Sequence, residues 1–138
     1  MSERIDLARF GTRTSADAGF DLTLKSTDTG EPVPGCVLRI LGRDSRVYQQ
    51  ALNEQSDRFR ELAAQGKTLT REERTTAEVE LAAALVVGWP ENWDLNGEPL
   101  AYSNANAVKL LHECPAIREQ IEEAASKRAN FLPGSAKA

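Results

Sequence analysis

The chain has 138 residues and a formal net charge of −4; 41% of its residues are hydrophobic, 28% are charged and only 6% are aromatic. This length fits one domain over residues 1–138, with a core built mainly from Leu, Val, Ile and Ala. The acidic balance disfavours general nucleic-acid binding, and no apolar run approaches the about 20 residues of a membrane span. We therefore expect no nucleic-acid partner and no membrane partner. The first residues lack the pattern of a signal peptide, which favours the cytoplasm over secretion as a disulfide scaffold.

An antiparallel hairpin is predicted over residues 18–42, after a small and polar segment, residues 11–19, that predicts a loop. Apolar and polar residues alternate over residues 20–24, which is typical of a half-buried strand, and residues 36–41 predict the second strand. The Gly and Pro residues at 26–35 predict the loop between them. Two strands alone are marginally stable in water. The hairpin must therefore pack on helices, gain a third strand from the N-terminus or pair with another subunit.

A helical region is predicted over residues 45–131, followed by a flexible tail at residues 133–138. Its first helix, residues 46–65, starts after a capping residue and stops before a glycine. One apolar stripe, broken by a single glutamine, runs along this helix: Tyr48, Leu52, Gln55, Phe59 and Leu62.

The second predicted helix begins with a Thr-x-x-Glu capping box at Thr70 and continues through an apolar run to Val87. A Gly-Trp-Pro step then ends it, because a proline disfavours helix at the preceding residue. The apolar run offers no polar position to water. We therefore expect Leu81, Leu85 and Val86 to lie in the core.

Two shorter helices are predicted near the C-terminus. Ser103 can cap a helix over residues 104–113, and Pro115 fits the first turn of a fourth helix. An i, i+4 apolar stripe runs along the fourth helix: Ile117, Ile121, Ala125 and Ala129. The expected fold class is therefore α+β, with an N-terminal antiparallel hairpin or small sheet followed by about four helices.

Both tryptophans of this aromatic-poor chain lie together between the second and third predicted helices. Residues 90–103 predict a loop, and the Asn-Gly step at residues 96–97 predicts a tight turn that needs positive φ. Two interpretations stay open. Trp89 and Trp93 close the core at the end of the second helix, with Tyr102 beside them, or they anchor a partner.

No catalytic, metal or cofactor site is predicted. Cys36 and Cys114 can pair only if the fold brings their Cα atoms within about 7 Å, and free thiols are the expected state. His112 and Cys114 do not complete a metal site, because the chain has no other His and only one other Cys. A single histidine without a nucleophile-elbow motif also argues against a Ser-His-Asp triad.

Several short motifs follow one another in a fixed order between residues 18 and 131. They are a Thr-Gly-Glu-x-x-Pro turn at 29–34, a Gly-x-Asp-Ser step at 42–45, a Gly-Trp step at 88–89, an Asp-x-Asn-Gly-x-Pro turn at 94–99, a Ser-x-x-Asn helix start at 103–106 and a Pro-x-x-Arg helix at 115–118. In this order they resemble the tail assembly chaperones of long-tailed phages and prophages.

This resemblance implies a non-enzymatic factor that binds the apolar tape-measure protein in the host cytoplasm. It also implies that the factor helps to recruit the tail-tube protein and is not part of the mature virion. A weak homo-oligomer is compatible with this role, because many weak copies along one chain gain by avidity. We place the partner-binding surface at the tryptophan loop, with the candidate residues Trp89, Trp93, Asp94, Gly97, Pro99 and Tyr102.

Two other functions stay open. The first is a structural virion component, such as a minor tail or head–tail joining protein, which requires large obligate interfaces. The second, less favoured, is a small regulatory or DNA-binding protein of the phage.

Overall fold

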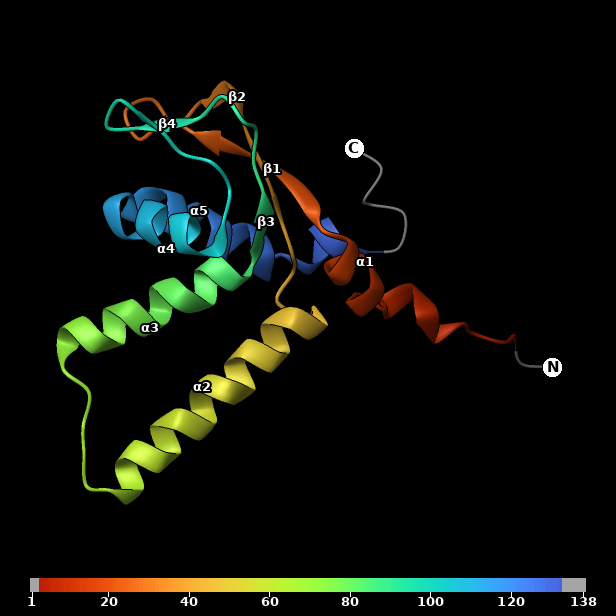
Figure 1. The fold of residues 1–138 in the computed structure, drawn as a ribbon. Helices are drawn as coiled ribbons and strands as arrows, with labels where there is room; N and C mark the ends of the chain where they lie inside the picture. Colours follow the sequence, from red (N-terminus) through yellow and green to blue (C-terminus); the bar gives the residue numbers. More distant parts are fainter. Residues whose placement is uncertain (1–2, 133–138) are drawn as a thin grey trace.

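A small antiparallel sheet near the N-terminus, followed by helices, makes up the fold, which confirms the predicted α+β class (Figure 1). The computed structural model describes residues 3–132; the predicted flexible tail, residues 133–138, lies outside them. The strands are β1 (Phe20–Lys25), β2 (Pro32–Ile40), β3 (Val86–Gly88), β4 (Asp94–Leu95) and β5 (Glu98–Pro99). The α-helices are α1 (Arg13–Ala18), α2 (Arg46–Ala64), α3 (Arg71–Ala84), α4 (Asn104–Glu113) and α5 (Pro115–Ser126). Two 3₁₀ helices lie near the ends, η1 (Leu7–Phe10) and η2 (Arg128–Phe131).

The predicted hairpin forms between β1 and β2, with Phe20 opposite Ile40 and Leu22 opposite Leu38. The prediction of a loop up to residue 35 is wrong, because β2 already begins at Pro32, which lies opposite Lys25. Proline is tolerated in a strand where its missing N–H faces no partner strand. That condition holds here, because β3 pairs with β2 only near the other end of β2.

The third strand of the sheet is β3, which pairs antiparallel with β2 in the order β1-β2-β3. The expectation that the second helix continues to Val87 is therefore wrong. Of the three alternatives for stabilising the hairpin, the structure shows packing on the helices, and its third strand comes from residues 86–88 and not from the N-terminus. Helix α3 ends at Ala84 and Leu85 is its C-cap. The adjacent β-branched residues Val86 and Val87 favour strand, and the Leu41 N–H donates to the Leu85 carbonyl at 2.7 Å.

The prediction of a loop over residues 11–19 is also wrong, because α1 forms there. Tertiary contacts hold this short helix in place. Ala16 is fully buried, and an added Cβ at Gly42 would lie 2.8 Å from the Ala16 Cβ. The Asp17 carboxylate accepts a hydrogen bond from the Arg46 N–H at the start of α2 and pairs with the Arg46 side chain.

Capping residues set the starts of the longer helices, as the sequence predicts. The Ser45 and Ser103 side chains accept backbone N–H groups at the starts of α2 and α4, and Thr70 forms a complete capping box with Glu73. Pro115 occupies the first turn of α5. The observed first residues of these four helices therefore agree with the predicted first residues to within one residue.

The core lies between the sheet and helices α3, α4 and α5. Leu85 and Val86 belong to it, as predicted, whereas Leu81 is only half-buried. Most of the large, fully buried side chains come from these elements and the α3–β3 junction, and one comes from η2: Leu38, Ile40, Val79, Leu85, Leu111, Ile121 and Phe131. No helix within residues 3–132 combines the length and the apolar character needed to cross a membrane.

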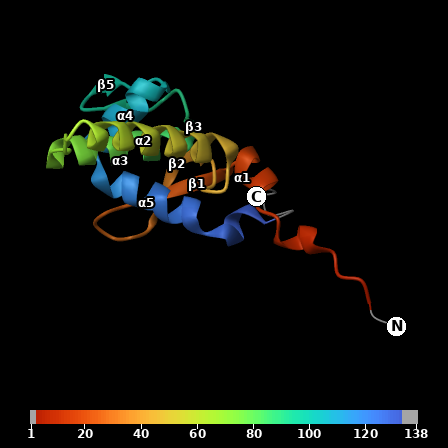
Figure 2. The ribbon, with the colours of Figure 1, turned by 90° about the horizontal axis from the view of Figure 1, so that it is seen from below.

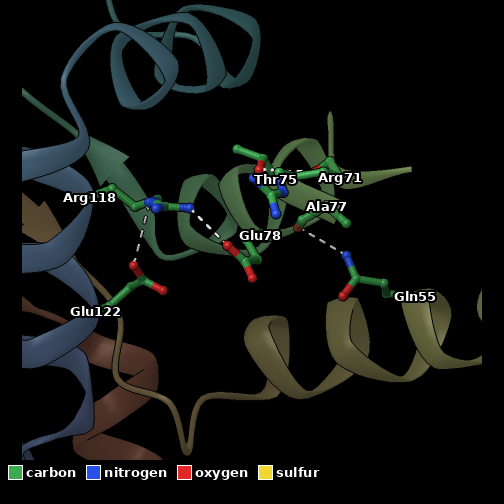
Figure 3. Close-up of polar contacts among 7 residues, drawn as sticks. All are labelled: Gln55, Arg71, Thr75, Ala77, Glu78, Arg118 and Glu122. Atoms are coloured by element: carbon green, nitrogen blue, oxygen red, sulfur yellow. Dashed lines mark hydrogen bonds and ion pairs between the residues drawn. The ribbon is translucent and has the colours of Figure 1, made fainter. Parts of the chain in front are cut away.

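Helix α2 lies outside this core, with α3 between it and α4 (Figure 1). None of its 19 residues, all of which the structure describes, is buried. Gln55, the polar residue of its stripe, donates to the Ala77 carbonyl of α3 at 3.0 Å (Figure 3). The apolar stripe of α2 is therefore only partly covered by α3.

A second polar contact joins α3 to α5. The Arg118 guanidinium donates to Glu78 at 3.2 Å, and its Nε lies 3.6 Å from Glu122 one turn along α5 (Figure 3). The second separation is that of an ion pair and is too long for a hydrogen bond. The Arg118 side chain is 18% exposed but that of Glu78 is 64% exposed, so water screens the pair and its contribution to the packing of α5 is modest.

Asp44 joins three segments just before α2. Its carboxylate accepts hydrogen bonds from the Arg128 guanidinium of η2 at 2.8 and 3.0 Å and from the Thr12 hydroxyl at the start of α1. These hydrogen bonds, that of Arg128 first, lower the pKa of Asp44 from 3.8 to about 2. The charged Asp44 carboxylate therefore links Thr12, before α1, and Arg128, in η2, to the segment that precedes α2.

Leu85→Ala is expected to lower the free energy of unfolding by about 2–5 kcal/mol, through lost transfer energy and a residual cavity. Leu85 is 1% exposed at the junction of α3 and β3, whereas the neighbouring Val87 is 42% exposed. Val87→Ala, the matched control, should change the free energy by less than about 0.5 kcal/mol. Urea unfolding of both variants measures the difference, and equal losses would contradict the assignment of Leu85 to the core.

Asp44→Asn is expected to lower the free energy of unfolding by about 1–2 kcal/mol at neutral pH, because hydrogen bonds to a charged group are lost. The expected loss in the free energy of unfolding is modest because the Arg128 side chain is 74% exposed and water screens its charge. The pKa of Asp44 is lowered on folding, so this stabilisation is present above about pH 4 and is lost as the pH falls toward about 2. Urea unfolding at several pH values should show wild type and variant converging in acid. A constant difference would contradict this account.

Candidate partner-binding site

Three aromatic side chains meet beside the end of the sheet. The rings of Trp89 and Trp93 are stacked, with centroids 5.6 Å apart and planes 9° apart. The Tyr102 ring meets Trp89 edge to face, with centroids 5.1 Å apart. Such offset-stacked and edge-to-face arrangements are the favourable geometries of aromatic pairs. We call these three residues the aromatic cluster.

The polar atoms of the aromatic cluster bind main-chain carbonyls. The Trp89 indole donates to Leu100 at 2.8 Å and the Tyr102 hydroxyl donates to Val86 at 2.8 Å. The Trp93 indole donates to Gly35 of β2 at a longer 3.4 Å. Burial raises the pKa of Tyr102, so its hydroxyl stays protonated and available as a donor at neutral pH. The aromatic cluster is therefore hydrogen-bonded to two strands of the sheet, through Trp93 to β2 and through Tyr102 to β3.

A short hairpin, β4 and β5 joined by a two-residue turn, lies between Trp93 and Tyr102 in the chain. Asn96 and Gly97 have φ of +53° and +82°, as a type I′ turn requires, which confirms the predicted tight turn. Asp94 lies opposite Pro99, and the Leu100 N–H donates to the Trp93 carbonyl at 2.8 Å. The exposed turn, residues 96–97, is therefore held by the β4–β5 pairing and by the hydrogen bond between Leu100 and Trp93.

An apolar cleft of about 340 Å³ lies beneath Trp93 and the hairpin. We define it by six apolar side chains from four parts of the chain: Leu24, Trp93, Leu95, Leu100, Leu110 and Ile117. Both cysteines also line it; Cys36 and Cys114 are half-buried free thiols. Burial, with a smaller effect of the Glu113 charge, raises the pKa of the Cys114 thiol, so it is neutral at physiological pH. The arrangement suits the insertion of an apolar side chain from a partner.

The structure brings the six predicted site residues into one region. Trp89, Trp93 and Tyr102 form the aromatic cluster, while Asp94, Gly97 and Pro99 belong to the hairpin and are exposed. Trp89 and Trp93 are both half-buried and pack against the core, so the loop contributes to the core as well. That these residues bind a partner stays a prediction.

Sequence reasoning missed the floor of the apolar cleft. Leu24 comes from β1, whereas Leu110 and Ile117 come from α4 and α5. In the sequence, each is an ordinary apolar position of a strand or helix, with no local signal that sets it apart. Across residues 3–132, no group of three or more His, Cys, Asp and Glu side chains is placed to hold a metal ion.

Residues 43–138, more than half of the chain, match the model of a family described as YdaY prophage protein. The chain belongs to this family. No curated protein and no solved structure is significantly similar to it. The matched region contains the aromatic cluster, the hairpin and helices α2 to α5, so the prophage origin applies to the part of the chain that carries the candidate site.

Gly97→Ala is expected to lower the free energy of unfolding by about 1–2 kcal/mol, because φ of +82° strains any residue with a Cβ. No atom lies within 4 Å of an added Cβ at Gly97, so the loss is conformational and not steric. Gly88→Ala is the matched control, since Gly88 has equal space and no positive φ. It should be neutral or slightly stabilising, because it restricts the unfolded chain. Urea unfolding monitored by tryptophan fluorescence measures both, and equal effects would contradict the type I′ turn.

Proposed function

We propose that this prophage protein is a non-enzymatic tail assembly chaperone that binds the tape-measure protein. The proposal combines the prophage family with the ordered motifs that resemble tail assembly chaperones. The observation that carries it is the apolar cleft of about 340 Å³, one wall of which is Trp93, directly before the β4–β5 hairpin. Tryptophan held in a partly buried position is the residue type most enriched among interface hot spots.

The chemistry of the cleft fits an apolar helical partner. A tape-measure protein exposes long apolar stripes that aggregate unless they are covered. The cleft offers leucine, isoleucine and indole surface, which takes up an apolar side chain by hydrophobic contact. Asp94 also lines the cleft and is exposed, so the rim of the cleft carries a hydrated carboxylate. One copy then covers one short stretch of the tape-measure chain.

The proposed role places the protein in the host cytoplasm during tail assembly, with the tail-tube protein as a second partner. Many copies along one tape-measure chain gain affinity by avidity even when each contact is weak. Weak single contacts also allow the chaperone to leave as tail-tube subunits arrive.

Trp93→Ala is expected to weaken binding of the tape-measure protein by about thirtyfold or more, since loss of an aromatic anchor costs about 2 kcal/mol or more. Co-expression of the tape-measure protein of the same prophage with each variant, followed by co-purification and a melting curve, is the measurement. Glu91→Ala, an exposed change in the same loop, is the matched control.

Normal melting with lost co-purification supports the site. Normal melting with full co-purification removes Trp93 from the site, and a lowered melting temperature assigns the loop to core closure. Mass spectrometry of purified phage particles separates the proposed chaperone from a structural virion component. The chaperone should be missing from complete particles, and stoichiometric presence would contradict the proposal.

A further inference from the structure

A second apolar surface lies between α2 and α3, at the end where the two helices are connected. It is a groove of about 440 Å³, and its apolar lining consists of Phe59, Leu62, Leu69 and Ala77. We call it the outer groove. Its lining shows why the end of the α2 stripe is not buried: Phe59 and Leu62 face a space that α3 alone does not fill.

The N-terminal segment presents three large apolar side chains to solvent. Ile5, Leu7 and Phe10 are 72%, 71% and 70% exposed. Leu7 and Phe10 are three residues apart in the 3₁₀ helix η1, where side chains at i and i+3 are aligned on one side. Single exposed apolar residues are normal, but three within six positions form a patch that other proteins use for contacts. We call residues 3–10 the arm.

Phe10 of the arm cannot reach the outer groove of its own chain. Thr12, the N-cap of α1, and Asp17, within α1, are fixed to Asp44 and Arg46 at the start of α2. Phe59 lies 13 residues further along α2, about 20 Å away at 1.5 Å per residue. Phe10 is two residues from the fixed Thr12 and can extend only about 7 Å. Figures 1 and 2 agree that the arm and the α2–α3 connection point toward opposite ends of the molecule.

We propose that the arm of one copy docks in the outer groove of a second copy, with Leu7 and Phe10 against Phe59, Leu62 and Leu69. The proposal matches the patch of exposed apolar side chains at one end of the chain with the partly filled apolar groove at the other. Mutual exchange of two arms closes a dimer, while exchange in one direction links copies in a row.

The outer groove is mainly acidic, and one arginine of the arm lies beside the apolar side chain that would enter it. Glu72, Glu73 and Glu80 line the outer groove, against the single cation Arg58, which pairs with Glu80 at 3.7 Å. Glu73 is held by the capping box of α3, whereas Glu72 has no ion-pair partner among residues 3–132.

On the arm, Arg9 lies against the Phe10 ring, 6.0 Å from its centroid, and has no carboxylate partner in the same described range. The arm also carries Glu3 and Arg4 at its start, and the Asp6 carboxylate accepts a hydrogen bond from the Ala8 N–H. Arg9 therefore enters the groove with Phe10 and meets the unpaired carboxylate of Glu72.

The test is sedimentation velocity of the full chain over a range of concentrations. The wild type should associate as its concentration rises, and Phe10→Ser should weaken this association at least tenfold without changing the melting temperature, because Phe10 is exposed. Val47→Ser is the matched control, since Val47 is 55% exposed but lies in neither surface. A wild type that stays monomeric, or a Phe10→Ser variant that associates like the wild type, would overturn the proposal.

Charge exchange identifies the two surfaces. Arg9→Glu and Glu72→Lys should each weaken association several-fold, and the double variant should recover most of the loss. A mixture of Phe10→Ser with Glu72→Lys should form mixed species, because the arm of the second variant still fits the groove of the first. If Glu72→Lys has no effect while Phe10→Ser does, the contact joins arm to arm and the outer groove is not the docking site.

Discussion

The antiparallel pairing of β3 with β2 is the contact on which the rest of the fold depends. It stops α3 at Ala84 and turns the chain into the sheet, so that Leu85 and Val86 enter the core directly after the helix. It also completes a sheet that two strands alone would leave marginal. Because β3 ends at Gly88, it delivers Trp89 and the following hairpin to one end of the sheet, where the candidate site lies.

Stability and recognition are combined in the aromatic cluster. Trp89 and Tyr102 each bind a main-chain carbonyl at 2.8 Å, so their loss would leave buried acceptors without partners. Trp93 has the longest of the three hydrogen bonds and forms a wall of the apolar cleft. The structural role thus belongs mainly to Trp89, and a binding role is left to Trp93, which is why a change at Trp93 alone separates the two interpretations.

Local signals decided which elements the sequence could predict. The caps at Ser45, Thr70 and Ser103 and the Asn-Gly step are chemical requirements of a few adjacent residues, and the structure follows them. The strand at Val86 was missed because an apolar run fits helix and buried strand equally well, and pairing with β2 decides between them. The apolar cleft could not be predicted either, because Leu24 and Ile117 are 93 residues apart and become neighbours only through the fold.

The two proposed surfaces occupy separate elements, which has a consequence for assembly. The apolar cleft is built from β1, α4, α5 and the hairpin, whereas the outer groove is built from α2, α3 and their connection, and no residue lines both. One copy would therefore hold a tape-measure segment and a neighbouring copy at the same time. Copies linked by their arms would bind a long apolar chain with a higher effective concentration than separate copies. Removing the arm would then weaken coverage of the long chain while leaving the contact of each single copy unchanged.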